Sequence, residues 1–133
     1  MDFNQIIAFH GHLGPYLVLG YRAGEEAIRL IGAQKHFGVK VEVACPDLPP
    51  PRCFIDGLQL STGATFGKAN ISQTTAPEIM AKISNKKTGQ TVTVELTDYM
   101  KSLFKPRTHE ELDVFAREVA AMPLEQILSI KSE

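Results

Sequence analysis

The chain has 133 residues, with 14 basic and 15 acidic side chains and a net charge of −1. This length is typical of one domain that buries a core without needing disulfides or metals to stabilise it. The balanced charge argues against a nucleic-acid partner. The two cysteines, Cys45 and Cys53, do not make a secreted disulfide framework. The opening MDFNQIIAFH lacks the pattern of a signal peptide, and the apolar runs are too short to span a bilayer. We therefore expect a cytoplasmic protein without membrane contact.

The N-terminal part predicts two helices. Residues 2–9 have an apolar side and favour a short helix. Residues 15–32 favour a long one, with Pro15 at its first position, where the missing N–H is harmless. The first half of this helix is apolar nearly all round, which is typical of a helix that starts in the core. Gly20 and Gly24 lie four residues apart, hence on one face, and let another backbone approach closely.

The middle of the chain predicts strands around a second helix. Residues 39–45 alternate valine with polar residues and indicate a half-buried strand. A proline-rich crossover leads to a helix over residues 52–63. A short strand is expected over residues 68–72, and residues 78–96 indicate a hairpin around NKKTG.

The C-terminal third is predicted to be helical. Thr108 and Glu111 form a capping box, and Pro123 opens a last short helix. Residues 1–133 are therefore expected to form a single α+β domain, an antiparallel sheet packed with helices and followed by a helical C-terminal segment. The apolar half of the long helix and the C-terminal helices offer more hydrophobic surface than one thin layer covers. This predicts a homodimer.

Two histidines stand at the start of the long helix. In FHGHLGPYLVLGYRAG, residues 9–24, His10 and His12 are one residue apart, in a turn favoured by the neighbouring glycines and proline. A turn can direct both side chains to one site, and neutral imidazole is the commonest metal ligand. The alternative is that one or both only cap the helix or hydrogen-bond the backbone.

Cys53 falls in the first turn of the second helix. There the helix dipole favours thiolate over thiol, and the neighbouring Arg52 acts in the same direction. Asp56 shares its face and is a candidate general base. With the two histidines, Cys53 would supply three metal ligands and leave a fourth position open, as in a reactive zinc site. The alternative is a small buried hydrophobe, which is the simpler interpretation for Cys45.

The segment GATFGKAN, residues 63–70, is not a phosphate-binding P-loop. Three residues separate its glycines instead of four, and Ala69 stands where the Mg²⁺-binding hydroxyl is needed. Lys68 is either an anion partner beside the site or a solvated lysine. His36 and His109 are interpreted as surface histidines. Four polar residues either line a pocket beside Cys53 or cap a helix end: Gln59, Ser61, Thr62 and Thr65.

Taken together, FHGHLGPYLVLGYRAG and the later CFIDGLQLSTGATFGKANI resemble the FmdE family of formylmethanofuran dehydrogenase proteins. That family has a His-Gly-His-x-Cys-Pro turn before a Gly-x-Arg helix. Its later motifs are Cys-x-x-Asp-[Ala/Gly]-[Ile/Leu]-Gln and Thr-Gly-Cys-Thr-x-Gly-Lys. The likeness covers essentially the whole chain. The matching positions are His10, His12, Cys53, Asp56, Gln59, Thr62, Gly63, Gly67 and Lys68.

The resemblance implies an α+β fold, homodimers with exchanged helical segments, and a metal-associated pocket. It also implies association with a molybdenum or tungsten formylmethanofuran dehydrogenase. Two family cysteines are replaced, by Gly14 and by Ala64, and no cysteine follows Cys53 to form a C-terminal zinc ribbon. The expected cofactor is a divalent metal such as zinc, bound by His10, His12 and Cys53, with water or another small ligand in place of the missing thiols.

Three functions follow as hypotheses. The first is a metal-binding accessory protein of the dehydrogenase. The second is a stand-alone enzyme in which a metal-activated water attacks a small substrate, with Cys53 and Asp56 as catalytic residues. The third is a metal-free dimeric module that binds a pterin-like or other small anion.

Overall fold

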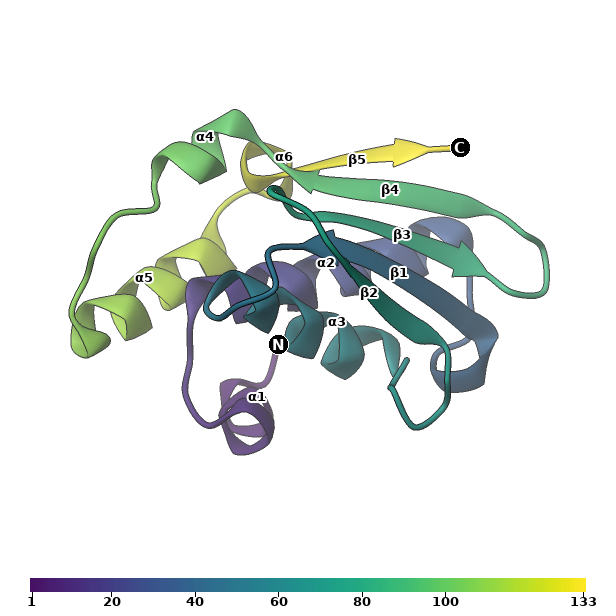
Figure 1. Ribbon diagram of the computed structural model, residues 1–133, viewed down its shortest axis with the longest axis horizontal. Helices are drawn as coiled ribbons and strands as arrows, with labels where there is room; N and C mark the ends of the chain where they lie inside the picture. Colours follow the sequence, from purple (N-terminus) through teal and green to yellow (C-terminus); the bar gives the residue numbers. More distant parts are fainter.

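The computed structural model describes residues 1–133 as a five-stranded sheet in the order β2-β1-β3-β4-β5, with helices packed on it (Figure 1). The strands are β1 (Val39–Cys45), β2 (Ile71–Thr75), β3 (Met80–Asn85), β4 (Thr91–Leu96) and β5 (Leu128–Ser132). The α+β class predicted from the sequence is confirmed. The sheet is mixed rather than wholly antiparallel, because β1 and β2 run parallel while every other neighbouring pair is antiparallel.

The helices are α1 (Phe3–His10), α2 (Pro15–Ile31), α3 (Phe54–Thr62), α4 (Asp98–Ser102), α5 (His109–Ala121) and α6 (Leu124–Ile127), with two 3-10 turns at His36–Gly38 and Pro51–Cys53. Several predicted ends are confirmed. Gly32 and Gly63 close α2 and α3 in the left-handed conformation, and Thr108 and Glu111 form both bonds of the capping box of α5.

The helices α2 and α3 cross with almost no space between their backbones. A Cβ added to Gly20 would overlap the carbonyl oxygen of Phe54, and one added to Gly57 would overlap the carbonyl oxygen of Leu17. Gly24 meets α3 in the same way, at the hydroxyl of Ser61. The predicted close approach of another backbone is therefore confirmed at Gly20, whereas side chains of α3 fill the space at Gly24. The contact at Gly20 fixes the first turn of α3 against α2.

The core lies between α2 and one face of the sheet. The helix α2 packs against β3, β4 and β5, with α3 and α5 packed beside it. Every second residue of β1 is buried and its neighbours point into solvent, as the valine alternation predicts. The largest fully buried side chains include Leu17, Leu19, Phe54, Leu58, Val41, Ile83 and Val92. None of the helices is both long and apolar enough to cross a membrane.

Candidate functional site

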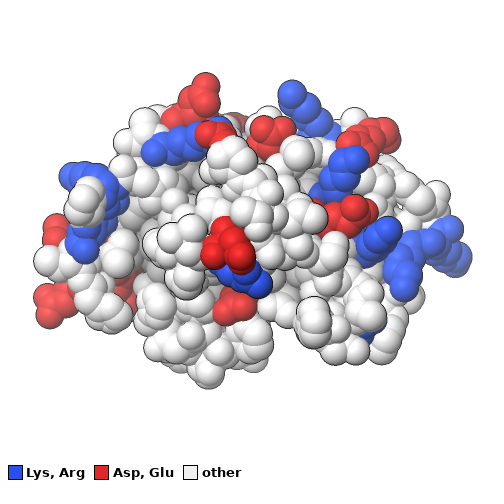
Figure 2. Space-filling view, in the orientation of Figure 1, with Lys and Arg blue, Asp and Glu red and all other residues white.

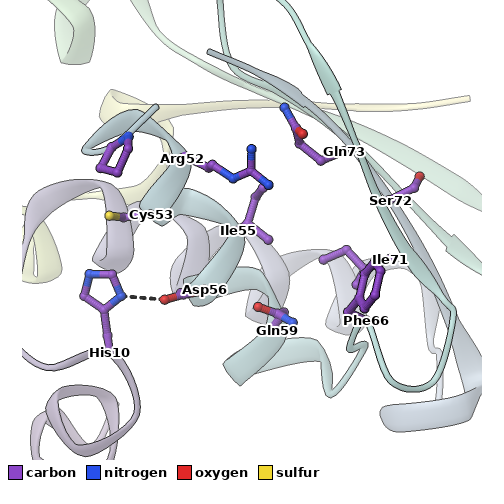
Figure 3. Close-up of a pocket in the computed structure, with 11 residues that line it drawn as sticks. His10, Arg52, Cys53, Ile55, Asp56, Gln59, Phe66, Ile71, Ser72 and Gln73 are labelled. Atoms are coloured by element: carbon purple, nitrogen blue, oxygen red, sulfur yellow. Dashed lines mark hydrogen bonds and ion pairs between the residues drawn. The ribbon is translucent and has the colours of Figure 1, made fainter. Parts of the chain in front are cut away.

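The site is built where α1 ends beside α3. Gly11 takes the left-handed conformation that ends α1, with φ 109°, and this leaves His10 in the last turn of the helix. Asp56 stands in the first turn of α3. The His10 Nδ1–H donates to Asp56 Oδ2 at 2.5 Å, an ion-pair distance between groups 46 positions apart in the sequence (Figure 3). An ionised carboxylate only accepts hydrogen bonds, so it places the ring hydrogen on Nδ1.

The other ring nitrogen of His10 has no partner. The side chain is 9% exposed, and Nε2 is the one buried side-chain nitrogen or oxygen of the chain that makes no hydrogen bond. Leaving such a group unsatisfied costs about 1–3 kcal/mol. With Nδ1 held by Asp56, Nε2 is the ring nitrogen left for whatever occupies the adjoining space.

Two cavities adjoin His10. The larger, of about 710 Å³, lies between α3 and β2, and Figure 3 shows His10, Cys53 and Asp56 along one end of it. The smaller, of about 350 Å³, lies between the start of α2 and the connection from α4 to α5. His10 and Cys53 line both cavities, and His12 lines the smaller one. The structure thus brings the three predicted metal ligands to one cavity.

The predicted thiolate character of Cys53 is wrong. Burial raises the pKa of the Cys53 thiol, and the negative charge of Asp56 raises it further. Arg52 does not offset this, because its guanidinium is paired with Asp47. Sequence reasoning counted the dipole of α3 and the adjacent arginine but had no means of seeing the burial. The free cysteine is therefore a thiol unless a bound cation favours its ionised form.

A third histidine joins the pair. The ring centroids of His10 and His12 are 4.8 Å apart, and those of His12 and His109 are 5.8 Å apart. Burial, and then the charges of His10 and His109, lower the pKa of His12. No local pattern marks His109 as part of the site, because it begins α5, and only the packing of that helix against α2 brings it here.

The predicted pocket residues divide into two groups. Gln59 lines the larger cavity. Thr62 is fully buried, donating to the carbonyl of Leu58 and accepting from the N–H of Ala64, so it closes the end of α3. Thr65 and Lys68 stabilise the following turn, where the Thr65 hydroxyl accepts from the N–H of Lys68 at 3.2 Å. Neither cavity is lined by Thr62, Thr65 or Lys68.

Ser61 also bonds within α3, where its hydroxyl donates to the Gly57 carbonyl, and it lines neither cavity. The segment after Gly63 turns into β2 rather than into a helix. A phosphate-binding P-loop places its lysine at the start of a helix, so the rejection of that motif agrees with the structure.

The two positions that depart from the family pattern lie in different surroundings. Gly14 lines the smaller cavity, and a Cβ built there would lie 3.6 Å from Nε2 of His12, at ordinary contact distance. Ala64 is fully buried in the core and lines neither cavity. Of these two positions, only Gly14 belongs to the lining of this site.

A complete metal shell is not assembled by this chain. No three side chains among its histidines, cysteines, aspartates and glutamates are grouped so as to hold a metal ion. A partial set does fit: His10 has the carboxylate-held ring typical of a metal-ligating histidine, with a buried Nε2 free, and Cys53 lines the same cavities. Two protein ligands describe a weak, open site rather than a structural one.

Fold and site together define a small α+β protein with a histidine- and cysteine-lined pocket beside a carboxylate. Residues 9–133 match the family described as FmdE, molybdenum formylmethanofuran dehydrogenase operon, and the chain belongs to that family. Among solved structures, an FmdE-like protein of the tungsten formylmethanofuran dehydrogenase type from Syntrophus aciditrophicus shares the fold, with a TM-score of 0.61. It is 21% identical, and the match covers 98% of this chain and 68% of that one. No curated protein matches.

Proposed function

We propose that this protein is an accessory protein of formylmethanofuran dehydrogenase type whose pocket binds a divalent metal such as zinc. The observation that carries the proposal is His10, whose Nδ1 is held by Asp56 and whose Nε2 is buried without a partner. A carboxylate that fixes the tautomer and orientation of an imidazole is the usual outer support of a metal-ligating histidine.

The protein ligands proposed are His10 and Cys53, which face both cavities, with His12 as a third. His12 is exposed and lines the smaller cavity, and its ring centroid lies 4.8 Å from that of His10. A bound cation would supply Lewis acidity and would ionise the Cys53 thiol, whose pKa burial raises in its absence. Asp56 would keep His10 oriented, and the remaining coordination positions would stay open to a small ligand.

The test is zinc uptake by untagged protein, measured by calorimetry and elemental analysis. We expect about one zinc per chain, removable by a mild chelator. Replacing His10→Gln or Cys53→Ala should each abolish uptake, because either change leaves only one of these two ligands beside the exposed His12. The thermal midpoint should stay near that of the wild type, since the site joins no strand or helix that the core does not already hold.

The matched control is Cys45→Ala, which removes the other cysteine. Cys45 is fully buried at the end of β1 and lines neither cavity, so the variant should still take up zinc. Unchanged zinc content in Cys53→Ala, or equal loss in Cys45→Ala, would contradict the proposal. It would leave His10 as a structural histidine with an unsatisfied ring nitrogen.

We further propose that the protein forms homodimers and that its physiological partners are subunits of the dehydrogenase. The family description, which names the operon of that enzyme, supports the second statement. Co-purification with the dehydrogenase subunits, compared between the wild type and a variant altered on its exposed apolar residues, tests it.

A further inference from the structure

The smaller cavity has a charge pattern that the metal proposal does not use. Its charged lining residues, histidines apart, are Lys105 and Arg107, and no carboxylate lines it. Both belong to the connection between α4 and α5. Figure 2 shows basic side chains gathered over that connection, at the left of the molecule. The lining of the smaller cavity therefore carries two positive charges and no carboxylate. Three glutamates, Glu110, Glu111 and Glu118, line a neighbouring hollow together with the same two cations.

Neither cation is paired within the chain. The seven ion pairs of the structure involve neither Lys105 nor Arg107. One Arg107 nitrogen donates to the backbone carbonyl of Lys105 at 3.4 Å, and its Cζ lies 3.7 Å from the ring centroid of Phe115. The nearby Glu111 carboxylate accepts from the N–H of Thr108 at 2.9 Å in the capping box and forms no ion pair with either cation.

The remaining walls are flat and apolar. Tyr16 and Phe104 stack with ring centroids 4.3 Å apart and an angle of 8° between the rings. Leu17 and Leu112 complete this wall. His10, with its unpartnered Nε2, and Cys53 lie in the same lining. An occupant thus meets cations, an aromatic surface and one unsatisfied ring nitrogen within a single cavity.

We propose that this cavity binds a small organic anion, a carboxylate on a flat apolar body, with Lys105 and Arg107 holding the acid group. Arginine and lysine recognise carboxylate through charge-assisted hydrogen bonds, which exceed neutral ones in strength. The apolar body packs on Tyr16 and Phe104. The inference deepens the proposed function, since it names the ligand class of the same pocket, but the anion-binding groups are separate from the metal ligands.

The test uses benzoate as the probe and benzamide, its uncharged counterpart of nearly the same shape, as the comparison. Binding is followed by calorimetry and by the imidazole nitrogen resonances of His10. We expect benzoate to bind and to shift the His10 Nε2 signal, while benzamide binds at least about tenfold more weakly. Lys105→Gln should weaken benzoate binding by about tenfold, the usual effect of one charged hydrogen bond.

The matched control is Lys87→Gln. Lys87 is an exposed lysine in the β3–β4 turn and makes no ion pair, so this variant should bind benzoate as the wild type does. Arg107→Lys keeps the positive charge but removes the planar guanidinium group. This variant should weaken benzoate binding by a smaller factor than Lys105→Gln. Equal affinity for benzoate and benzamide, or equal affinity in Lys105→Gln and Lys87→Gln, overturns the inference.

The metal proposal and the anion proposal are tested independently of each other. Each titration is run on chelator-treated and on zinc-loaded protein. Benzoate binding that depends on Lys105 in the chelator-treated protein supports the anion site even if zinc uptake is absent. Benzoate binding that requires zinc and is insensitive to Lys105→Gln overturns the inference and leaves the metal proposal standing.

Discussion

Asp56 and His10 are brought together from separate helices, and the bond between them determines which ring nitrogen is available. In a histidine that merely capped a helix, the second ring nitrogen would hydrogen-bond to a backbone carbonyl or to solvent. Here Nε2 has neither, since it is buried and unpartnered. A buried polar group without a hydrogen-bond partner in a cavity wall is typical of a binding site, because a ligand that bonds to it recovers the lost hydrogen-bonding energy.

A prediction at the residue scale concerns Gly14→Cys. A Cβ at position 14 lies 3.6 Å from His12 Nε2, and the backbone there is extended, with φ −140° and ψ 159°, so a side chain is accommodated without strain. The added thiol enters the smaller cavity beside His12, His10 and Cys53. We expect zinc affinity to rise by about tenfold or more, measured by competition with a chelating dye.

Ala64→Cys is the control for that variant, because it restores the other family cysteine. Ala64 is fully buried and lines neither cavity, so zinc affinity should match that of the wild type. A gain in Ala64→Cys equal to that in Gly14→Cys would show that the metal binds elsewhere.

At the scale of the elements, the crossing of α2 and α3 determines where Cys53 and Asp56 stand. Glycines on both helices remove the side chains that would hold the two backbones apart. The first turn of α3 is therefore fixed against the start of α2. His10, the last residue of α1 before the turn at Gly11, lies beside that first turn of α3. The positions of Cys53 and Asp56 in the site depend on this crossing.

Gly57→Ala tests the crossing. The new methyl group would overlap the Leu17 carbonyl and approach the N–H of Tyr21, both of which belong to the backbone of α2 and move only if the helix moves. We expect a loss of about 1–3 kcal/mol in the free energy of unfolding, measured by denaturant titration. This loss outweighs the gain in helix propensity from alanine, which is about 1 kcal/mol.

Gly67→Ala is the matched change outside the crossing. Its Cβ would have only the Thr65 hydroxyl near it, at 3.9 Å, and its φ is not positive. Stability should change by less than about 0.5 kcal/mol, as for most surface substitutions. If the two variants were equally stable, the close crossing would not be a constraint on the fold.

Local sequence signals predict most elements, and the errors have physical causes. Prolines, glycines and the capping box mark helix ends in the chain itself, so α2, α3 and α5 are predicted well. The parallel pairing of β1 and β2 is not predicted. A crossover helix between two strands, such as α3, favours parallel pairing, because it returns the chain to the end of the sheet from which the first strand began. Strand β5 escapes prediction because its alternation, at Leu128 and Ile130, spans only five residues after a short helix.

The site is predictable in part for a similar reason. His10, His12, Cys53 and Asp56 belong to compact motifs, so their residue types alone suggest a shared chemistry. The wall supplied by Phe104, Lys105 and Arg107 belongs to the α4–α5 connection, and His109, whose ring lies beside that of His12, begins α5. Their position depends on how α5 packs against α2, which no local pattern encodes.

At the scale of the whole molecule, the apolar half of α2 is not the surface that a partner would cover. Leu17, Val18 and Leu19 are fully buried within one chain, so α2 offers no free surface there. The two exposed residues of β1, Lys40 and Glu42, are charged and pair with each other. The exposed apolar side chains that remain include Phe37 and Phe66, at 69% and 86% exposure.

These two phenylalanines support a second copy as the partner. Phe66 lies in the turn after α3 and lines the larger cavity, and Phe37 lies in the 3-10 turn before β1. Lys68 Nζ, from the same turn as Phe66, stands 5.8 Å from the Phe37 ring centroid, so the two turns are neighbours. Covering rings of this size removes a large apolar area from water, as subunit interfaces do.

We therefore predict that the wild type is a dimer in light scattering at micromolar concentration and that Phe66→Ser shifts it toward the monomer. Losing one such anchor from an interface centre weakens association by about 2 kcal/mol or more, or roughly thirtyfold. Tyr99→Ser is the control, since Tyr99 is 51% exposed but lies on α4, far from the turn after α3 (Figure 1). A monomeric wild type would contradict the predicted dimer, and dissociation by Tyr99→Ser alone would place the interface on α4 instead.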